Sequence, residues 1–111
     1  MAKKELLKIS HILLHRLRDK GVIISKIIVF GSYTSGRRKQ DSDIDIVIVS
    51  KDFRNKTIFE KTELTLGIHF ELVKTIMKPF DLLYYSDKEW ERGSSLMINA
   101  AKEEGMIVFQ Q

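Results

Sequence analysis

The sequence predicts a mixed α/β fold, in which a small mixed sheet of about four strands is flanked by helices. Short apolar runs rich in β-branched residues recur along the chain, and segments with a helical spacing of apolar residues separate them. The chain has 111 residues, a length that fits one domain spanning 1–111 and can bury a core without cross-links. No repeat or long linker divides it.

A helix is predicted first, over residues 2–20. Apolar residues recur there every three or four positions between Leu6 and Leu17, which places them on one face. Gly21 then supplies a C-terminal cap. Lysine, arginine and histidine side chains occupy the other face, which fits either a solvated surface or a track for phosphates, and the solvated surface is the favoured interpretation.

Two strands, a turn and a second helix are predicted next. Residues 26–30 and 44–49 are short, apolar and β-branched, as buried strands are. The polar segment 51–55 predicts a turn. Residues 56–77 carry apolar positions at helical spacing, although some also alternate as in a strand. Their length favours one helix, with Gly67 as its weak point.

The last part of the chain predicts two strands around a capped helix. Residues 80–85 follow a proline and are rich in aromatic and apolar side chains, which favours a third strand. Ser86 followed by Glu89 is the pattern of a capping box, so a helix begins directly after Ser86. This helix, interrupted near residues 93–95, leads to a fourth short strand at 106–109.

Composition narrows the function classes. The formal charge of +4 favours polyanionic partners such as nucleotides or nucleic acid without requiring them. The absence of cysteine excludes disulfides and thiolate metal sites. No window holds the roughly 18 consecutive apolar residues of a membrane span, and the N-terminus lacks a signal-peptide core. A cytoplasmic protein without a membrane partner is therefore expected.

Chemistry concentrates in the stretch 31–49. Gly31 and Ser32 directly follow the first predicted strand. Glycine lets the backbone approach a ligand closely, and the free N–H groups of a helix starting shortly afterwards would face a triphosphate. Arg37 and Arg38 lie on the same connection and would neutralise further phosphate charge. This connection is the candidate nucleotide-binding segment.

Three aspartates are the candidate metal ligands. Asp43 and Asp45 open the second strand, and side chains two residues apart on a strand lie about 6.6 Å apart on one face. Their mutual repulsion would be relieved by a hard divalent cation such as Mg²⁺. Asp81, near the start of the third strand, is expected to be a buried charge that needs a partner. Each feature alone also fits a turn, an edge residue or a salt bridge, but their combination favours a metal site.

The ordered set Gly31-Ser32, Asp43-x-Asp45 and Asp81 resembles the nucleotidyltransferase superfamily that includes DNA polymerase beta, in particular its minimal stand-alone members. The resemblance implies two Mg²⁺ ions and transfer of a nucleoside monophosphate from an NTP, with ATP expected, to an acceptor hydroxyl. By position it makes Gly31 and Ser32 phosphate contacts and the three aspartates catalytic metal ligands, Asp81 also being the candidate base.

One segment departs from the pattern of this superfamily. Many relatives have an alanine and a basic residue before the glycine that follows the glycine-serine pair, whereas here Thr34 and Ser35 precede Gly36. The basic contact expected at Ser35 is therefore missing, and Arg37 or Arg38 is the candidate to replace it.

The resemblance also implies a partner. Minimal members often act with a separate small helical protein of the HEPN type, in pairs that behave like toxin and antitoxin, and some add a nucleotide to a tyrosine of that partner. The oligomeric state stays open, a homo-oligomer included. Two alternatives remain from the sequence: a non-enzymatic antitoxin that neutralises its partner by binding alone, and a nucleic-acid-binding module, which is not favoured.

Overall fold

The computed structural model describes residues 3–30, 43–93 and 95–111. The helices are α1 (Lys3–Asp19), α2 (Ile58–Leu64), α3 (Ile68–Ile76), α4 (Asp87–Arg92) and α5 (Leu96–Glu104), and η1 (Lys51–Phe53) is a single 3-10 turn. The strands are β1 (Lys26–Phe30), β2 (Ile44–Val49), β3 (Phe80–Tyr85) and β4 (Met106–Gln110). The predicted mixed α/β architecture is confirmed.

The four strands form one sheet in the order β3-β2-β1-β4. β1 pairs antiparallel with both β2 and β4, whereas β2 and β3 are parallel. A parallel pair needs a crossover, and the segment containing α2 and α3 provides it. β3 and β4 are therefore the two edges of the described sheet.

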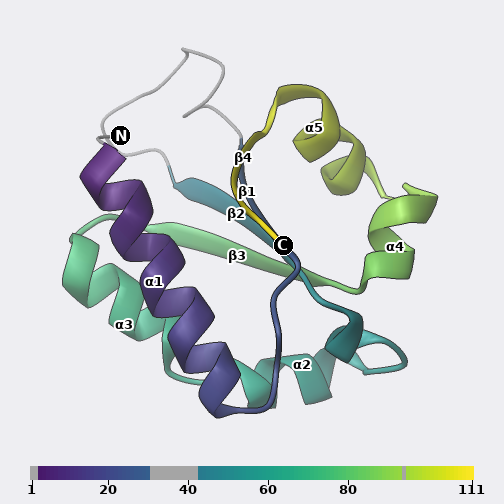
Figure 1. Ribbon diagram of the computed structural model, residues 1–111, viewed down its shortest axis with the longest axis horizontal. Helices are drawn as coiled ribbons and strands as arrows, with labels where there is room; N and C mark the ends of the chain where they lie inside the picture. The colour runs from purple at the N-terminus through teal and green to yellow at the C-terminus, as the bar shows by residue number, and fades with distance from the viewer. Residues whose placement is uncertain (1–2, 31–42, 94) are drawn as a thin grey trace.

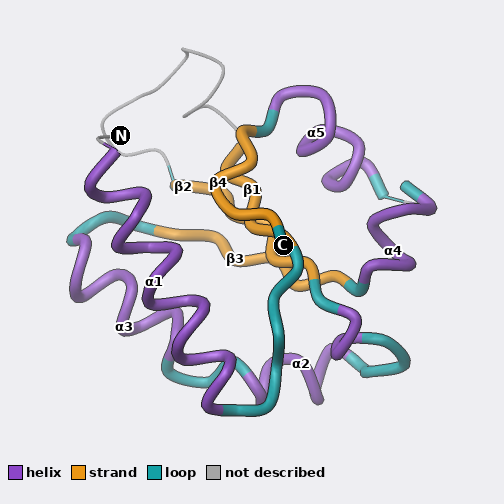
Figure 2. The backbone as a smooth tube through the Cα atoms, in the orientation of Figure 1, coloured by secondary structure: helices purple, strands orange, loops and turns teal. Residues whose placement is uncertain are grey.

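Helices cover both faces of the sheet, with α1 and α3 on one side and α4 and α5 on the other (Figures 1 and 2). The side chains of β2 alternate between these two layers. Ile44, Ile46 and Ile48 belong to the apolar cluster under α1 and α3, and Val47 and Val49 belong to the cluster under α4 and α5. This alternation is why the strand is apolar at almost every position.

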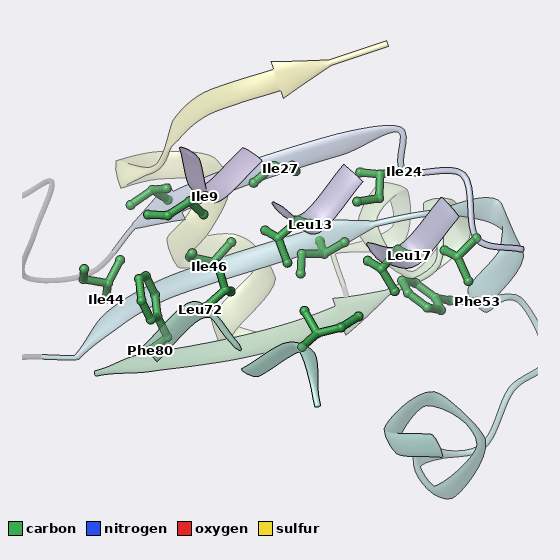
Figure 3. Close-up of a cluster of buried hydrophobic side chains, with 14 residues drawn as sticks. Ile9, Leu13, Leu17, Ile24, Ile27, Ile44, Ile46, Phe53, Leu72 and Phe80 are labelled. Carbon is green, nitrogen blue, oxygen red and sulfur yellow. The ribbon is translucent and has the colours of Figure 1, made fainter. Parts of the chain in front are cut away.

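The larger core lies between the sheet and the pair α1 and α3 (Figure 3). Leu13 and Leu17 of α1 and Leu72 of α3 are fully buried there, and burying such a side chain contributes about 1.5–3 kcal/mol. The smaller core contains Trp90 and Ile98. Among the described residues, no helix combines the length and apolar character that a membrane crossing requires.

The boundaries of the first three strands match the predictions for residues 26–30, 44–49 and 80–85. The helix expected after Ser86 is also confirmed: its side chain accepts a hydrogen bond from the Glu89 N–H, and the Glu89 side chain bonds back to the Ser86 N–H. The predicted interruption near residues 93–95 separates α4 from α5.

The single helix predicted over residues 56–77 is wrong, because α2 and α3 are separate helices. Thr57 forms a capping box with Glu60, which starts α2 at Ile58. Gly67 has a φ of 86°, a left-handed conformation that glycine adopts without strain. The predicted helix therefore breaks at the residue that weakened the prediction.

Gly105 is required where α5 turns into β4. A Cβ added there would overlap the Ala101 carbonyl oxygen and a methyl group of Ile28. We expect Gly105→Ala to lower the free energy of unfolding by about 1–3 kcal/mol, since one of the two obstacles is backbone and cannot rotate away. Urea denaturation checks this, with Glu104→Ala as the neighbouring control, and equal midpoints for both variants would contradict it.

Candidate functional site

The parallel pairing of β2 and β3 brings two of the predicted carboxylates together. The register pairs Ile44 with Phe80 and Asp45 with Asp81. The Ile44 N–H donates to the Pro79 carbonyl at 2.9 Å, and this bond begins the ladder one step before the aspartates. Paired residues of neighbouring strands lie about 4.8 Å apart and project to the same face. Asp45 and Asp81 are therefore neighbours on one face of the sheet.

Toward the C-terminal ends of β2 and β3, helices α4 and α5 cover this same face of the sheet. Val47 and Leu83, the next residues of β2 and β3 with the same orientation, belong to the smaller core. Asp43 precedes β2 by one residue, and strand alternation directs it to the same side as Asp45. The three carboxylates thus gather at the rim where the helical cover ends.

The environments of the three carboxylates differ. Asp45 is half-buried, whereas Asp43 and Asp81 are exposed. The expectation that Asp81 would be a buried charge is wrong, because β3 is an edge strand and Asp81 lies near its beginning. The alternative of a salt bridge is not supported either: the ion pairs among the described residues are Arg16–Glu71, Arg54–Asp87, Lys61–Glu89 and Lys78–Glu5.

Partial burial raises the pKa of Asp45, and the negative charges of Asp81 and Asp43 raise it further. Both causes disfavour the ionised carboxylate, and no cation within the described ranges pairs with it. Among the described residues, nothing therefore compensates the negative charge at this position. A bound cation would relieve this repulsion.

The raised pKa predicts how stability depends on pH. The folded state disfavours the charged form of Asp45, so its destabilising effect is full above the raised pKa and vanishes as the pH falls below the ordinary aspartate value of about 3.9. We expect metal-free Asp45→Asn to melt a few degrees higher than the wild type at pH 7 and at the same temperature as the wild type at acid pH. Thermal melts with and without EDTA check this.

Asp19→Asn is the matched control for this measurement, because Asp19 is exposed at the end of α1. A pH-independent difference between wild type and Asp45→Asn would contradict the proposed role of charge.

The donor set suits a hard cation, although it does not form a closed cage. Within residues 3–30, 43–93 and 95–111, no three His, Cys, Asp or Glu side chains lie close enough together to hold a metal ion as they stand. Carboxylate oxygens are the ligands that Mg²⁺ prefers, and this ion commonly takes one or two of them together with phosphate oxygens. Asp43 and Asp81 are exposed and can rotate toward Asp45. The residues therefore fit Mg²⁺ shared with a nucleotide.

The predicted phosphate-binding residues Gly31, Ser32, Arg37 and Arg38 lie outside the described residues, and their roles stay predictions. The nearest described neighbour is Phe30, the last residue of β1, which pairs with Asp45.

Sequence reasoning missed two side chains that hold the outer edge of β3. The Lys61 ammonium donates to the Tyr84 carbonyl at 3.0 Å and contacts the Glu89 carboxylate at 3.1 Å. His69 Nε2 lies 2.7 Å from the Phe80 carbonyl oxygen. No local sequence pattern predicts these contacts, because the two groups in each of them belong to different elements. They fix the strand that carries Asp81.

Comparisons with solved structures agree with this architecture. A chain of a toxin–antitoxin complex with AMP-PNP is 22% identical with a TM-score of 0.62, over 91% of this chain and 73% of that one. A chain of the MntA-HepT toxin–antitoxin complex is 18% identical with a TM-score of 0.61, over 99% and 74%. A chain from the tri-AMPylated Shewanella oneidensis HEPN toxin in complex with MNT antitoxin is 21% identical with a TM-score of 0.56, over 96% and 73%. These likenesses show a shared fold.

A family model adds evidence from the sequence. No curated protein sequence matches this chain. The model described as "Nucleotidyltransferase domain" matches residues 10–107, a range that runs from within α1 to the start of β4 and includes all three aspartates. Because that match spans most of the chain, the protein belongs to the nucleotidyltransferase family, which the resemblance of its aspartate pattern predicted.

Proposed function

We propose that residues 1–111 form one catalytic domain that transfers AMP from ATP to an acceptor hydroxyl, with Mg²⁺ held by Asp43, Asp45 and Asp81. The register that sets Asp45 beside Asp81 is the observation that carries this proposal. Two carboxylates that repel each other on adjacent strands destabilise the fold, and they make chemical sense where a cation and a polyphosphate bind together.

Three aspartates would bind the cations, and the segment after β1 would bind the phosphates. Asp43 and Asp45 would hold one cation, and Asp45 and Asp81 would hold a second, at the rim where the helical cover of the sheet ends. Two bound Mg²⁺ ions would lower the pKa of the acceptor hydroxyl and stabilise the negative charge of the departing pyrophosphate. Gly31, Ser32, Arg37 and Arg38 are proposed to bind the phosphates of ATP.

The reaction balances with Asp81 as the base. The acceptor oxygen forms a bond to the α-phosphorus of ATP, and the bond from that phosphorus to the β-phosphate oxygen breaks. Pyrophosphate leaves with the bonding electrons, and the proton of the hydroxyl passes to the Asp81 carboxylate, which is exposed and so accessible to an acceptor.

A tyrosine of a small helical HEPN-type protein is the proposed acceptor. The description of one structural neighbour names a tri-AMPylated HEPN toxin in complex with an MNT antitoxin, and that of another names AMP-PNP. These descriptions concern those proteins, and they support ATP as the substrate and a partner protein as the acceptor here.

The test is a transfer assay with the protein, its co-purified partner, Mg²⁺ and ATP labelled at either the α- or the γ-phosphate. We expect label from the α-position on a partner tyrosine, one pyrophosphate released per transfer, and no transfer after addition of EDTA. Transfer of γ-label would identify a kinase instead, and the absence of both label and pyrophosphate would refute the proposal.

A further inference from the structure

A groove whose walls carry large apolar side chains among polar ones runs along the outer edge of β3 and reaches Asp81. It has a volume of about 440 Å³ and lies between β3 and the junction of α2 with α3. Leu66 and Phe70 form one wall, and Leu82 and Tyr84 form the other. Leu66 is 72% exposed and Phe70 is 70% exposed. Large apolar side chains with this exposure, gathered in one hollow, are typical of a surface that binds another molecule.

The apolar character continues from the groove onto α2. This helix has no buried residue, and Phe59 on it is 82% exposed. Phe59 precedes the groove residue Thr62 by three positions, so both lie on the same side of the helix. The exposed apolar surface therefore extends beyond the groove. A small ligand would not need so large a surface.

The edge of β3 offers backbone hydrogen bonds to an occupant. In the described sheet β3 pairs with β2 alone. The outward carbonyls of Phe80 and Tyr84 are occupied by His69 and Lys61. Strand alternation directs the N–H and C=O of Leu82 to the same outer side, midway between those two contacts. A peptide segment lying in the groove could pair with Leu82 as an added strand does.

The charges of the groove select the class of acceptor. Among the described residues that line it there is no lysine or arginine, and Asp81 contributes negative charge at one end. Burial raises the pKa of Tyr84 to about 12, so this wall stays neutral. A nucleic acid would bring phosphates to a groove whose lining holds no lysine or arginine, and the nearby Lys61 ammonium is already engaged by the Glu89 carboxylate, which weakens the interaction that supplies most of its affinity. A protein segment with apolar side chains can pack against the groove walls and can also form hydrogen bonds with the N–H and C=O of Leu82.

We infer that this groove docks the protein that carries the acceptor hydroxyl. The inference rests on the proposed function and adds the surface that recognises the acceptor. Asp81 lines the groove and also belongs to the carboxylate cluster. Strand alternation turns its side chain to the opposite face of the sheet from Leu82 and Tyr84, but β3 is an edge strand, so a segment held between Phe70 and β3 reaches the rim beside the carboxylates. The groove thus makes a protein, rather than the end of a nucleic acid, the acceptor.

The test uses variants that change the walls of the groove without changing the carboxylates. Leu66→Glu and Phe70→Glu place a charge on exposed positions, and Leu96→Glu on α5 is the matched control because Leu96 is 88% exposed and does not line the groove. Each purified protein is incubated with α-labelled ATP, Mg²⁺ and extract of the cells that naturally make it. Labelled products are then digested separately with protease and ribonuclease.

We expect the wild type and Leu96→Glu to label a protease-sensitive product equally and the two groove variants to label it at least about tenfold less at limiting acceptor, as the loss of a binding hot spot does. All four proteins should gain the same thermal stability from Mg²⁺ and ATP, which shows that the nucleotide site and the fold are intact. Measured with the isolated acceptor, the defect should be in KM for the acceptor, with kcat retained.

The remaining outcomes would contradict either the docking surface or the proposed function. Full labelling of a protein by Phe70→Glu and Leu66→Glu would overturn the docking surface and leave the proposed function standing. Label that is sensitive to ribonuclease alone would overturn the choice of a protein acceptor. An absence of any label with the wild type would refute the proposed function, and the inference with it.

Discussion

We expect Asp45→Asn to lower nucleotide transfer by about 100-fold or more, the scale of losses when a charge-stabilising group is removed from an active site. The asparagine keeps the shape of the side chain but loses the charge that would bind a cation. Asp45 is the middle of the three carboxylates, next to Asp81 in register and two residues from Asp43, so it would contribute to both proposed cation positions. Initial rates of α-label transfer at saturating ATP measure the effect.

The control for this prediction is Asp19→Asn, which should transfer at the wild-type rate. If metal-free Asp45→Asn melts at a higher temperature than the wild type at pH 7, as expected, the loss of activity is not a loss of fold. Retention of transfer above a tenth of the wild-type rate would place the cations elsewhere. If the inactive variant still neutralised its partner fully, the non-enzymatic antitoxin would replace the enzyme as the explanation of that neutralisation.

Phe53→Ala should lower the free energy of unfolding by about 3–5 kcal/mol. Phe53 lies in the 3-10 turn after β2, is 1% exposed, and packs edge-on against Tyr84 with 5.6 Å between ring centroids. Its removal leaves a cavity between that turn and β3, on the side of the sheet covered by α1 and α3. Urea denaturation should show the loss, and the melting temperature should fall by about 10 °C or more.

Leu96→Ala is the comparison for the Phe53 variant, since Leu96 is almost fully exposed on α5 and should cost less than about 0.5 kcal/mol. A cost below about 1 kcal/mol for Phe53→Ala would mean that the turn can collapse onto the vacated space.

The parts of the fold that local chemistry determines were predictable from sequence. The β-branched runs located β1, β2 and β3 because their side chains must pack on two helical layers. Ser86 and Glu89 located the start of α4 because a capping box needs only those two residues and the backbone between them. The approach of Asp43 to Asp45 follows in the same way from strand geometry.

The remaining features depend on contacts between distant segments, which no local pattern encodes. Residues 51–55 resemble a polar turn, yet Phe53 is buried, because η1 lies against the apolar side of the sheet. An edge position was one of the alternatives for Asp81, but the sequence could not decide between it and a buried charge, because the order of the strands in the sheet is set by distant contacts. The register between Asp45 and Asp81 is set by pairing across the whole α2–α3 crossover.

That crossover also has a consequence for the kinetics of folding. β2 and β3 are the one parallel pair of the described sheet, and closing a long connection costs chain entropy before the ladder repays it. A refolding chain should therefore acquire helical circular dichroism from α1 before it acquires Mg²⁺-dependent nucleotide binding. Until β3 adds beside β2, Asp45 lacks its neighbour Asp81, so the proposed metal site is incomplete in a partly folded chain.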